Sequence, residues 1–483
     1  MHEPSRGPGP AFTQGVWGKV AQSEDRRSLA RALVGELEKG LELLGSLPAA
    51  VTFFGGARVK QSDPYYAVAE EMGALLAEKG IPPRTGAGPG IMSAVPEGYR
   101  ARLAAKAPEG PVREAAAAVA AAVSAQAEVE ASTSSSETDR GQALTQGFNI
   151  RLPFEQVVNP AIDVSLELAH FPTRKLMLYE NAYGVIIFPG GFGTLDELFE
   201  IWRLKLAGRL ADPFVLFGRD FWGPLVEALR GHLRVSDEAL SMLHLTDDPE
   251  EAIALVTRDP SNLRHGFGEP LSELGRRIAA ELVEGLVFLE NLPSAVTVIG
   301  GSRLELGDPH LAMAEALARH LAKEGVPTRA AGPGQLSVCL SRGGHAGAKY
   351  LPQQAFGMRR EDARNLYGAD RVHVVNDRLT HKVLLTEGSR AVVALPGGVG
   401  TLDELFSVIC QLQTRKIAHR RVVLLGTAHW APLFEALRAQ MLDGPRQTIS
   451  AGDLDLVTIT DDPAEAARLC LLPPPVLPPK LKR

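Results

Sequence analysis

Short apolar runs alternate along this chain with longer stretches whose apolar residues recur at helical spacing. The apolar runs contain four or five residues and end in glycines, prolines or other turn residues. Continuous runs of this kind are typical of parallel strands that are covered on both faces of a sheet. The expected strands are Val51–Phe54, Val185–Phe188, Phe214–Phe217, Val296–Ile299, Ala391–Leu395 and Val422–Leu425. The alternation predicts βαβ units, and therefore an α/β fold with doubly wound parallel sheets.

Two of the helical stretches have matching positions in the two halves of the chain. Tyr65–Lys79 and His310–Lys323 both carry Ala, Leu and Met at helical spacing. Gly80 and Gly325 follow these stretches, and we expect them to act as C-cap glycines.

The strand and helix pattern is part of an internal duplication. The recurring segments are SLPAAVTFFGGARV from Ser46 and NLPSAVTVIGGSRL from Asn291, GIPPRTGAGPG from Gly80 and GVPTRAAGPG from Gly325, PGGFGTLDELFE from Pro189 and PGGVGTLDELFS from Pro396, and LTDDPEEA from Leu245 and ITDDPAEA from Ile459. Four matches in the same order indicate two tandem copies of one domain. An amphipathic helix at about Glu24–Leu44 has a counterpart at Leu271–Leu289, so this helix belongs to the repeat.

The first copy carries an insertion. The offset between the copies falls from 245 at Ser46 to 207 at Pro189, so the first copy has about 38 extra residues between these points. An Ala-rich run sliding into a Ser/Thr/Glu tract places the insertion at about residues 100–143. Such composition favours a poorly ordered excursion, and a regulatory lid is the alternative. The predicted organisation is an N-terminal helical segment (1–45), a first domain (46–260), a linking helix (261–290), a diverged second domain (291–470) and a Pro-rich tail (471–483).

Composition narrows the class of protein. The 483 residues are 45% hydrophobic and 22% charged, which is typical of a soluble protein with two or three domains. A net charge of −6 argues against nucleic acid or an anionic membrane as the main partner. Cys339, Cys410 and Cys470 show no metal-ligand spacing and are expected to be reduced core thiols. We find no apolar signal region or membrane-length stretch, and we expect a cytoplasmic protein without a metal.

The candidate chemistry lies in the Gly-rich loop that joins a buried strand to a helix. Glycines there allow a ligand to approach the backbone, and the free N–H groups of the helix favour a phosphate. The hydroxyl of the loop Thr can cap the helix or donate to a phosphate oxygen. The expected binding residues are Gly190, Gly191, Gly193 and Thr194 in the first copy, and Gly397, Gly398, Gly400 and Thr401 in the second. The spacing differs from GxGxxG and GxxxxGK[ST], and an ordinary strand–helix turn is the structural alternative.

A carboxylate follows each loop by one helical turn. Glu197 and Glu404 stand three residues after the loop Thr and therefore face roughly the same way as the loop. Each carboxylate can be a capping or dipole partner of its helix. Alternatively, it can handle a water molecule or a developing positive charge next to a bound phosphate ester.

The combination of motifs in the first copy resembles the LOG family, whose motif is PGGxGTxxE. The resemblance is carried by PGGFGTLDE, by Arg174-Lys175 fifteen residues upstream of it, by GAGPGIM at Gly86, and by GFNIRLPFEQVVNP at Gly147. It covers about Leu47–Val256 and, more loosely, Leu292–Leu469. Members were often mislabelled as lysine decarboxylases.

The resemblance implies two tandem Rossmann-like domains that hydrolyse AMP-like nucleoside 5′-monophosphates to free base and ribose 5-phosphate, without a cofactor. Cytokinin riboside monophosphate phosphoribohydrolases belong to the family. Its catalytic Arg and Glu match Arg174 and Glu197, and a carboxylate is suited to stabilising an oxocarbenium-like state. Further binding residues are expected at Lys175, Gly55, Gly86, Gly88, Gly90 and Met92. Family members are usually dimeric, so the two copies form a pseudo-dimer within the chain, or each copy pairs in a homo-oligomer.

The second copy departs from the family pattern. It keeps Glu404 and Lys382, but His381 replaces the catalytic Arg, and Ala330 is matched with Gly86. MRREDARN stands roughly where NIRLPFEQ would be, and Arg378 lies one turn from His381. We expect this copy to bind a nucleotide without efficient turnover, or to serve the structure only.

Two other functions are alternatives to hydrolysis. Molybdenum-cofactor carrier proteins share the fold and a similar loop, so a nucleotide- or cofactor-binding carrier or sensor is the alternative. Arg174-Lys175 and GAGPGIM argue against a pure carrier. An amino-acid decarboxylase is disfavoured because no lysine stands in a convincing pyridoxal-phosphate context.

Overall fold

The structure, a computed structural model, describes residues 24–106, 144–152, 159–210, 213–258, 270–302, 304–332, 334–346, 352–358 and 369–473. Most of the predicted insertion and the end of the Pro-rich tail lie outside these residues. The described part of the insertion is helical, since α3 continues to Lys106.

Each half contains a seven-stranded sheet in which every pairing is parallel. The first sheet has the order β4-β3-β2-β1-β5-β6-β7 and the second has the equivalent order β11-β10-β9-β8-β12-β13-β14. The strands are β1 (Ala50–Phe54), β2 (Pro83–Thr85), β3 (Gln146–Ile150), β4 (Val164–Leu168), β5 (Ala182–Ile187), β6 (Phe214–Phe217), β7 (His244–Thr246), β8 (Ala295–Ile299), β9 (Thr328–Ala331), β10 (Gln354–Met358), β11 (Arg371–Val375), β12 (Ser389–Ala394), β13 (Val422–Leu425) and β14 (Val457–Thr460). The predicted α/β fold with two doubly wound parallel sheets is therefore confirmed.

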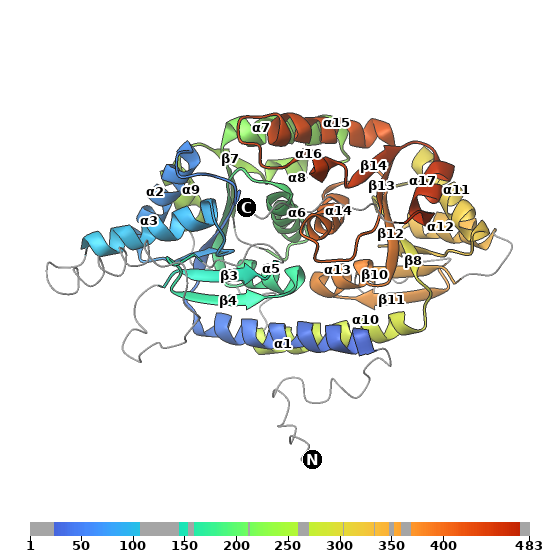
Figure 1. The fold of residues 1–483 in the computed structure, drawn as a ribbon, viewed down its shortest axis with the longest axis horizontal. Helices are drawn as coiled ribbons and strands as arrows, with labels where there is room; N and C mark the ends of the chain where they lie inside the picture. The colour runs from blue at the N-terminus through green and yellow to red at the C-terminus, as the bar shows by residue number, and fades with distance from the viewer. Residues whose placement is uncertain are drawn as a thin grey trace, which may run out of the picture.

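Helices cover both faces of each sheet (Figure 1). In the first half they are α1 (Glu24–Ser46), α2 (Pro64–Lys79), α3 (Ile91–Lys106), α5 (Phe171–Tyr179), α6 (Phe192–Leu206), α7 (Arg219–His232), α8 (Asp237–Ser241) and α9 (Pro249–Val256). In the second half they are α10 (Leu271–Glu290), α11 (Pro309–Lys323), α12 (Gln335–His345), α13 (Arg378–Thr386), α14 (Val399–Gln413), α15 (Thr427–Leu437), η5 (Arg438–Leu442), α16 (Ala451–Leu454) and α17 (Pro463–Leu471).

The helices predicted at Tyr65–Lys79 and His310–Lys323 end at the predicted residues, but only one of the two expected glycines is the C-cap. Gly80 caps α2 in the left-handed conformation, with φ of 67°. Glu324 is the C-cap of α11, and Gly325 follows it with φ of 75°. The left-handed residue therefore lies one position beyond the cap in the second half.

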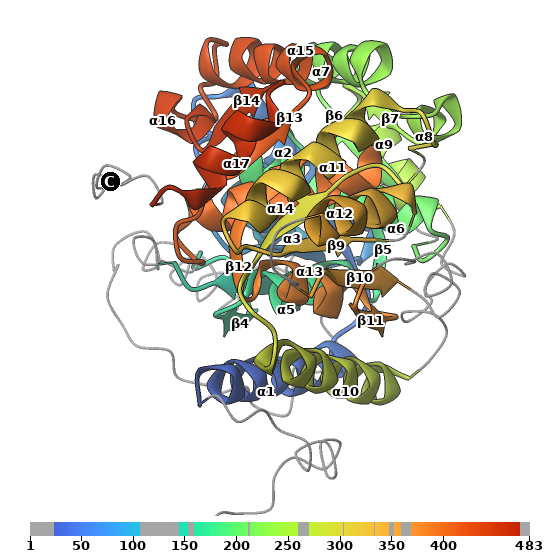
Figure 2. The same cartoon turned by 90° about the vertical axis from the view of Figure 1, so that its right-hand side faces the viewer.

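The two halves pack against each other through equivalent elements. α6 lies along α14 at the centre, α1 lies along α10, and α7 lies along α15 (Figures 1 and 2). One apolar cluster runs through both halves and includes Leu37, Leu198, Leu282 and Leu405. The chain thus contains a pseudo-dimer whose interface is part of its hydrophobic core.

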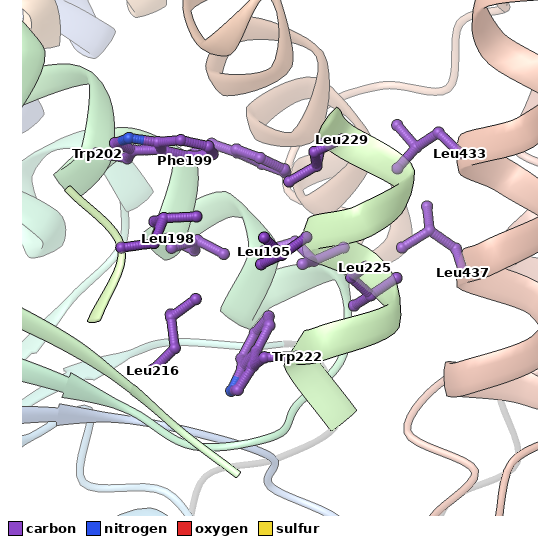
Figure 3. A pocket seen from close by; sticks show the side chains of 12 residues that line it. Leu195, Leu198, Phe199, Trp202, Leu216, Trp222, Leu225, Leu229, Leu433 and Leu437 are labelled. Carbon is purple, nitrogen blue, oxygen red and sulfur yellow. The ribbon is translucent and has the colours of Figure 1, made fainter. Parts of the chain in front are cut away.

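The contact between α6, α7 and α15 shows how completely this core is filled. Figure 3 shows Leu195, Leu198, Phe199 and Trp202 of α6 facing leucines of α7 and α15. The space among them is about 10 Å³, and apolar side chains line it. Trp202 satisfies its indole N–H by donating to the carbonyl of Ala239 at 2.9 Å. This layer is therefore packing rather than a ligand site.

Candidate functional site

A cleft of about 1380 Å³ opens over the carboxyl ends of β1, β2, β3 and β5. The sheet order reverses direction between β1 and β5, which is the position where ligands bind in doubly wound folds. First-half residues on its wall include Gly55, Gly86, Gly88, Met92, Asn149, Arg174, Gly191, Gly193, Thr194 and Glu197. We call this space the first cleft.

Arg174 and Glu197 face each other inside the first cleft. Arg174 stands on α5, where its Nε donates to the carbonyl of Phe148 at 2.9 Å. Its Nη1 lies 3.3 Å from Oε1 of Glu197, which is one turn into α6. The other Nη atom lies so close to Gly86 that any Cβ at this position would collide with it. Gly86 is therefore required by the guanidinium group of Arg174.

The environment of Glu197 makes it a carboxyl group that titrates near neutrality. Burial raises the pKa of Glu197 from 4.5 to about 7, although the charge of Arg174 acts in the opposite direction. A carboxyl group with such a pKa can exchange a proton at physiological pH.

The Gly-rich loop forms the start of α6. Gly191 is the N-cap of α6 and has no side chain to cap the helix, so the first N–H groups of the helix remain available at the cleft. The helix terminus also carries a partial positive charge. Together these features suit a phosphate group.

Three of the predicted binding residues do not lie on the cleft wall in the described part of the chain. Gly190 packs beneath the loop against Thr194, and Gly90, with φ of 70°, packs against the backbone of Gly56 and Ala57. Both glycines support the cleft from behind. Lys175 points away from it.

Lys175 belongs instead to a buried charge network between α6 and α14. Its Nζ lies 2.5 Å from Asp196 and 2.8 Å from Glu200. The equivalent Lys382 lies 2.8 Å from the same Glu200 and 2.6 Å from Asp403. Although burial alone would raise it, the pKa of Glu200 is lowered because the two ammonium groups lie beside its carboxylate. The placement of Lys175 and Lys382 thus contradicts their expected contact with phosphate.

The second half supplies one wall of the first cleft, which the sequence did not reveal. Cys410, Gln413 and Thr414 reach the cleft from α14. Arg446, Gln447 and Thr448 reach it from the segment between η5 and α16. No pattern within either copy identifies these residues, because their position depends on how the two halves pack.

Comparison with known proteins agrees with this geometry. The model of a family described as "Possible lysine decarboxylase", which is the LOG family, matches residues 125–256 and 347–470. The two matches together span more than half of the chain. The chain belongs to the LOG family.

Three of the individual proteins that resemble this chain have sequence identities of 18% to 33% to it. A cytokinin riboside 5′-monophosphate phosphoribohydrolase of Rhodococcoides fascians is 27% identical over 157 residues, which are 32% of this chain and 78% of the relative. A protein of the same name from Mycobacterium tuberculosis is 33% identical over 87 residues, which are 17% of this chain and 45% of the relative. The molybdenum cofactor binding protein of Rippkaea orientalis is 18% identical, with a TM-score of 0.28, over 44% of this chain and 96% of that protein.

The second LOG domain has its own cleft, of about 500 Å³. Its loop residues Gly397, Gly398, Gly400 and Thr401 and its carboxylate Glu404 line it. Arg203 and Arg234 of the first half complete its wall. Burial raises the pKa of Glu404 to about 7, as it does for Glu197.

The position equivalent to Arg174 holds a different residue in the second LOG domain. His381 stands there, 1% exposed, and neither ring nitrogen has a hydrogen-bond partner among the described residues. Burial and the charge of the nearby Arg378 together lower the pKa of His381 to about 3, so the imidazole is neutral. Arg378 does not take the place of the missing guanidinium group, because its own side chain is hydrogen-bonded to Asp403.

The structure also corrects the alignment of the loop after β9. Thr52 pairs with Arg84 and Thr297 pairs with Arg329 in equivalent registers, so Arg329 is the counterpart of Arg84. Ala331, and not Ala330, therefore takes the place of Gly86, two positions after the arginine. A methyl group now occupies the space that the guanidinium group of Arg174 uses in the first cleft, so the two replacements are sterically linked.

Proposed function

We propose that the first LOG domain hydrolyses the N-glycosidic bond of nucleoside 5′-monophosphates, releasing free base and ribose 5-phosphate. The observation that carries the proposal is the buried Arg174–Glu197 pair beside the N-terminus of α6. The names of the two relatives, both phosphoribohydrolases of cytokinin riboside 5′-monophosphates, support the same reaction class. The substrate phosphate would bind at Gly191–Thr194.

In this proposal the two charged groups have complementary roles. Cleavage of the C1′–N bond develops positive charge on the ribose, which the ionised carboxylate of Glu197 stabilises. The same carboxylate accepts a proton from the water that attacks C1′ and later releases it to solvent, while the departing base takes up a proton from solvent at its nitrogen. Arg174, held by Phe148, orients the phosphoribosyl part or the leaving base with its remaining N–H groups.

We further propose that the second cleft binds a ligand of the same class without hydrolysing it. It keeps the loop at the start of α14 and a carboxylate with a raised pKa, but it has a neutral His381 in place of the arginine. A regulatory or structural role fits this combination. Binding without hydrolysis in both halves, as in a carrier or sensor, is the second candidate function.

The deciding experiment incubates the purified chain with a panel of nucleoside 5′-monophosphates and measures free base by chromatography. We expect Glu197→Gln to reduce base release roughly 100-fold or more, since it removes both the negative charge and the proton acceptor. Glu404→Gln tests the second cleft, and Glu435→Gln, an exposed position, serves as the matched control.

Each outcome has a distinct meaning. Loss of base release only in Glu197→Gln supports hydrolysis in the first LOG domain. Loss only in Glu404→Gln would move the reaction to the second domain. Tight nucleotide binding without any base release would favour the carrier or sensor.

A further inference from the structure

One segment of the second half covers the first cleft and has no equivalent of the same length in the first half. It runs from residue 443 to residue 449, between η5 and the N-cap of α16, and we call it the strap. From the end of β13 at Leu425 to the N-cap Ser450 there are 25 residues, whereas from Phe217 to the equivalent Ser236 there are 19. The second half is therefore six residues longer at this point, and the extra residues lie in the strap.

The strap is fixed to the first half by several contacts. Arg446 donates to Asp220 at 3.1 Å, and its guanidinium carbon lies 4.4 Å from the centre of the Tyr65 ring. Arg58 donates to the backbone carbonyl of Gln447 at 3.4 Å. The end of the strap is held by its own half, where the N–H of Ile449 donates to the carbonyl of Met441 at 3.1 Å. These contacts hold the strap in one position over the cleft.

Its closest approach to the Gly-rich loop is made by Thr448. A Cβ at Gly191 would lie 2.8 Å from the carbonyl oxygen of Thr448, so the second glycine of the PGG motif is required by the strap. Gly191 is also the N-cap of α6. Thr448 is thus placed at the helix terminus that the proposed function assigns to the phosphate.

The hydroxyl group of Thr448 provides a second indication that a ligand binds here. Thr448 is 6% exposed, lines the first cleft, and its Oγ1 has no hydrogen-bond partner among the described residues. Buried hydroxyl groups are nearly always hydrogen-bonded, so an unsatisfied one on a cleft wall indicates a ligand atom. By contrast, the hydroxyl of Thr414 on the same wall already donates to its own helix at 2.7 Å.

We propose that Thr448, carried by the strap of the second half, binds the phosphate group of the ligand in the first cleft. The second half is then a component of the first active site. The hydroxyl group of Thr448 donates to a phosphate oxygen, and the same oxygen accepts from the N–H groups at the start of α6. The inference rests on the proposed function for the identity of the ligand, a phosphate monoester.

Arg234 takes the position of Thr448 in the second cleft, and the comparison supports a specific role for Thr448 in the first. The carbonyl of Arg234 lies 2.7 Å from the Cβ position of Gly398, as that of Thr448 does at Gly191. The side chain of Arg234, however, pairs with Asp308 at 2.7 Å. In both clefts a backbone carbonyl contacts the second glycine of the loop, but the residue that carries it is Thr448 in the first cleft and Arg234 in the second.

The test compares Thr448→Val, which keeps the shape and loses the hydroxyl, with Thr448→Ser, which keeps the hydroxyl. Dissociation constants for AMP, ribose 5-phosphate and adenosine are measured by calorimetry in the full chain carrying Glu197→Gln, which prevents turnover. Thr458→Val, an exposed position in β14, is the matched control. Thermal unfolding of each variant shows that it is folded.

We expect Thr448→Val to weaken the binding of AMP and ribose 5-phosphate by roughly 10-fold, the usual cost of losing a hydrogen bond to a charged group. Thr448→Ser should bind within about 2-fold of the parent. Adenosine should bind equally to all variants, because it has no phosphate. In the hydrolytic chain, Thr448→Val should raise KM more than it lowers kcat.

Unchanged AMP affinity in a folded Thr448→Val, or equal losses for AMP and adenosine, would overturn the inference. If Thr448→Val does not fold, the same comparison is made with Thr448→Ala. Ribose 5-phosphate binding that responds like AMP binding assigns the effect to the phosphate rather than to the base. Because binding is measured without turnover, a chain that releases no base would refute the hydrolase and leave this result standing.

Discussion

The burial of the Glu197 carboxyl group determines the pH range in which the first cleft can be active. Its pKa of about 7 arises because burial disfavours the charged form more than Arg174 favours it. Between pH 4.5 and 7 the folded chain holds a proton on Glu197 that the unfolded chain has lost. The contribution of this group to the free energy of unfolding therefore decreases as pH rises through that window.

Activity should change with pH in the opposite direction. Only the ionised Glu197 can accept a proton from water, so we expect kcat/KM for AMP to rise with pH and to reach half its maximum near pH 7. The pH profile of steady-state base release checks this expectation, with Glu197→Gln as the control that should lack the transition. A transition near pH 4.5 would show that the carboxyl group is not shielded from water in solution.

At the scale of single residues, the sequence predicted the Arg174–Glu197 pair because the family motifs cover both positions. It placed Lys175 wrongly because consecutive residues of a helix point about 100° apart, so Arg174 and Lys175 cannot both face one cleft. Thr448 could not be predicted, since it belongs to the other half and lies outside every recurring segment.

At the scale of elements, the buried network between α6 and α14 contains equal numbers of positively and negatively charged side chains. The network contains the cations Lys175, Lys382 and Arg378 and the carboxylates Asp196, Glu200 and Asp403. Its asymmetry lies at Glu200, whose counterpart in α14 is Ser407. A single carboxylate thus neutralises ammonium groups from both halves.

We expect Glu200→Gln to lower the free energy of unfolding by about 3–5 kcal/mol, since it leaves two buried ammonium groups with one carboxylate too few. Chemical denaturation at pH 7 measures the change, with the exposed Glu435→Gln as control. Equal denaturation midpoints for the two variants would mean that water enters the network and screens its charges.

The elements themselves were largely predictable, because apolar runs and helical spacing are local features. The strands at Phe214–Phe217 and Val422–Leu425 agree with the structure residue for residue. β5 and β12 begin earlier than the apolar runs, at Ala182 and Ser389, because backbone pairing with β1 and β8 extends past the apolar residues. The other strands are short or of mixed composition and were not predicted individually; they are β2, β3, β4, β7, β9, β10, β11 and β14.

At the scale of the whole molecule, the two halves share one core. The apolar cluster that contains Leu37, Leu198, Leu282 and Leu405 cannot be divided at the boundary between the sequence repeats. Separating the halves would expose α6 and α14 together with their charge network. The duplication is therefore a folding unit as well as a sequence feature.

We expect the full chain to unfold in a single calorimetric transition, because neither half can keep its core when the other unfolds. Glu200→Gln should shift this one transition to lower temperature without splitting it. Two separate transitions would show that each domain is stable alone and that the interface adds little.

Covalent fusion frees the two clefts from the symmetry that identical subunits impose. In a dimer encoded by one gene, any change in a residue that crosses to the partner alters both active sites at once. Here Cys410 reaches one cleft and its counterpart Arg203 reaches the other, so each position can mutate alone. The strap, with its six extra residues, is a product of that freedom, since an insertion tolerated over one cleft need not be tolerated over its twin.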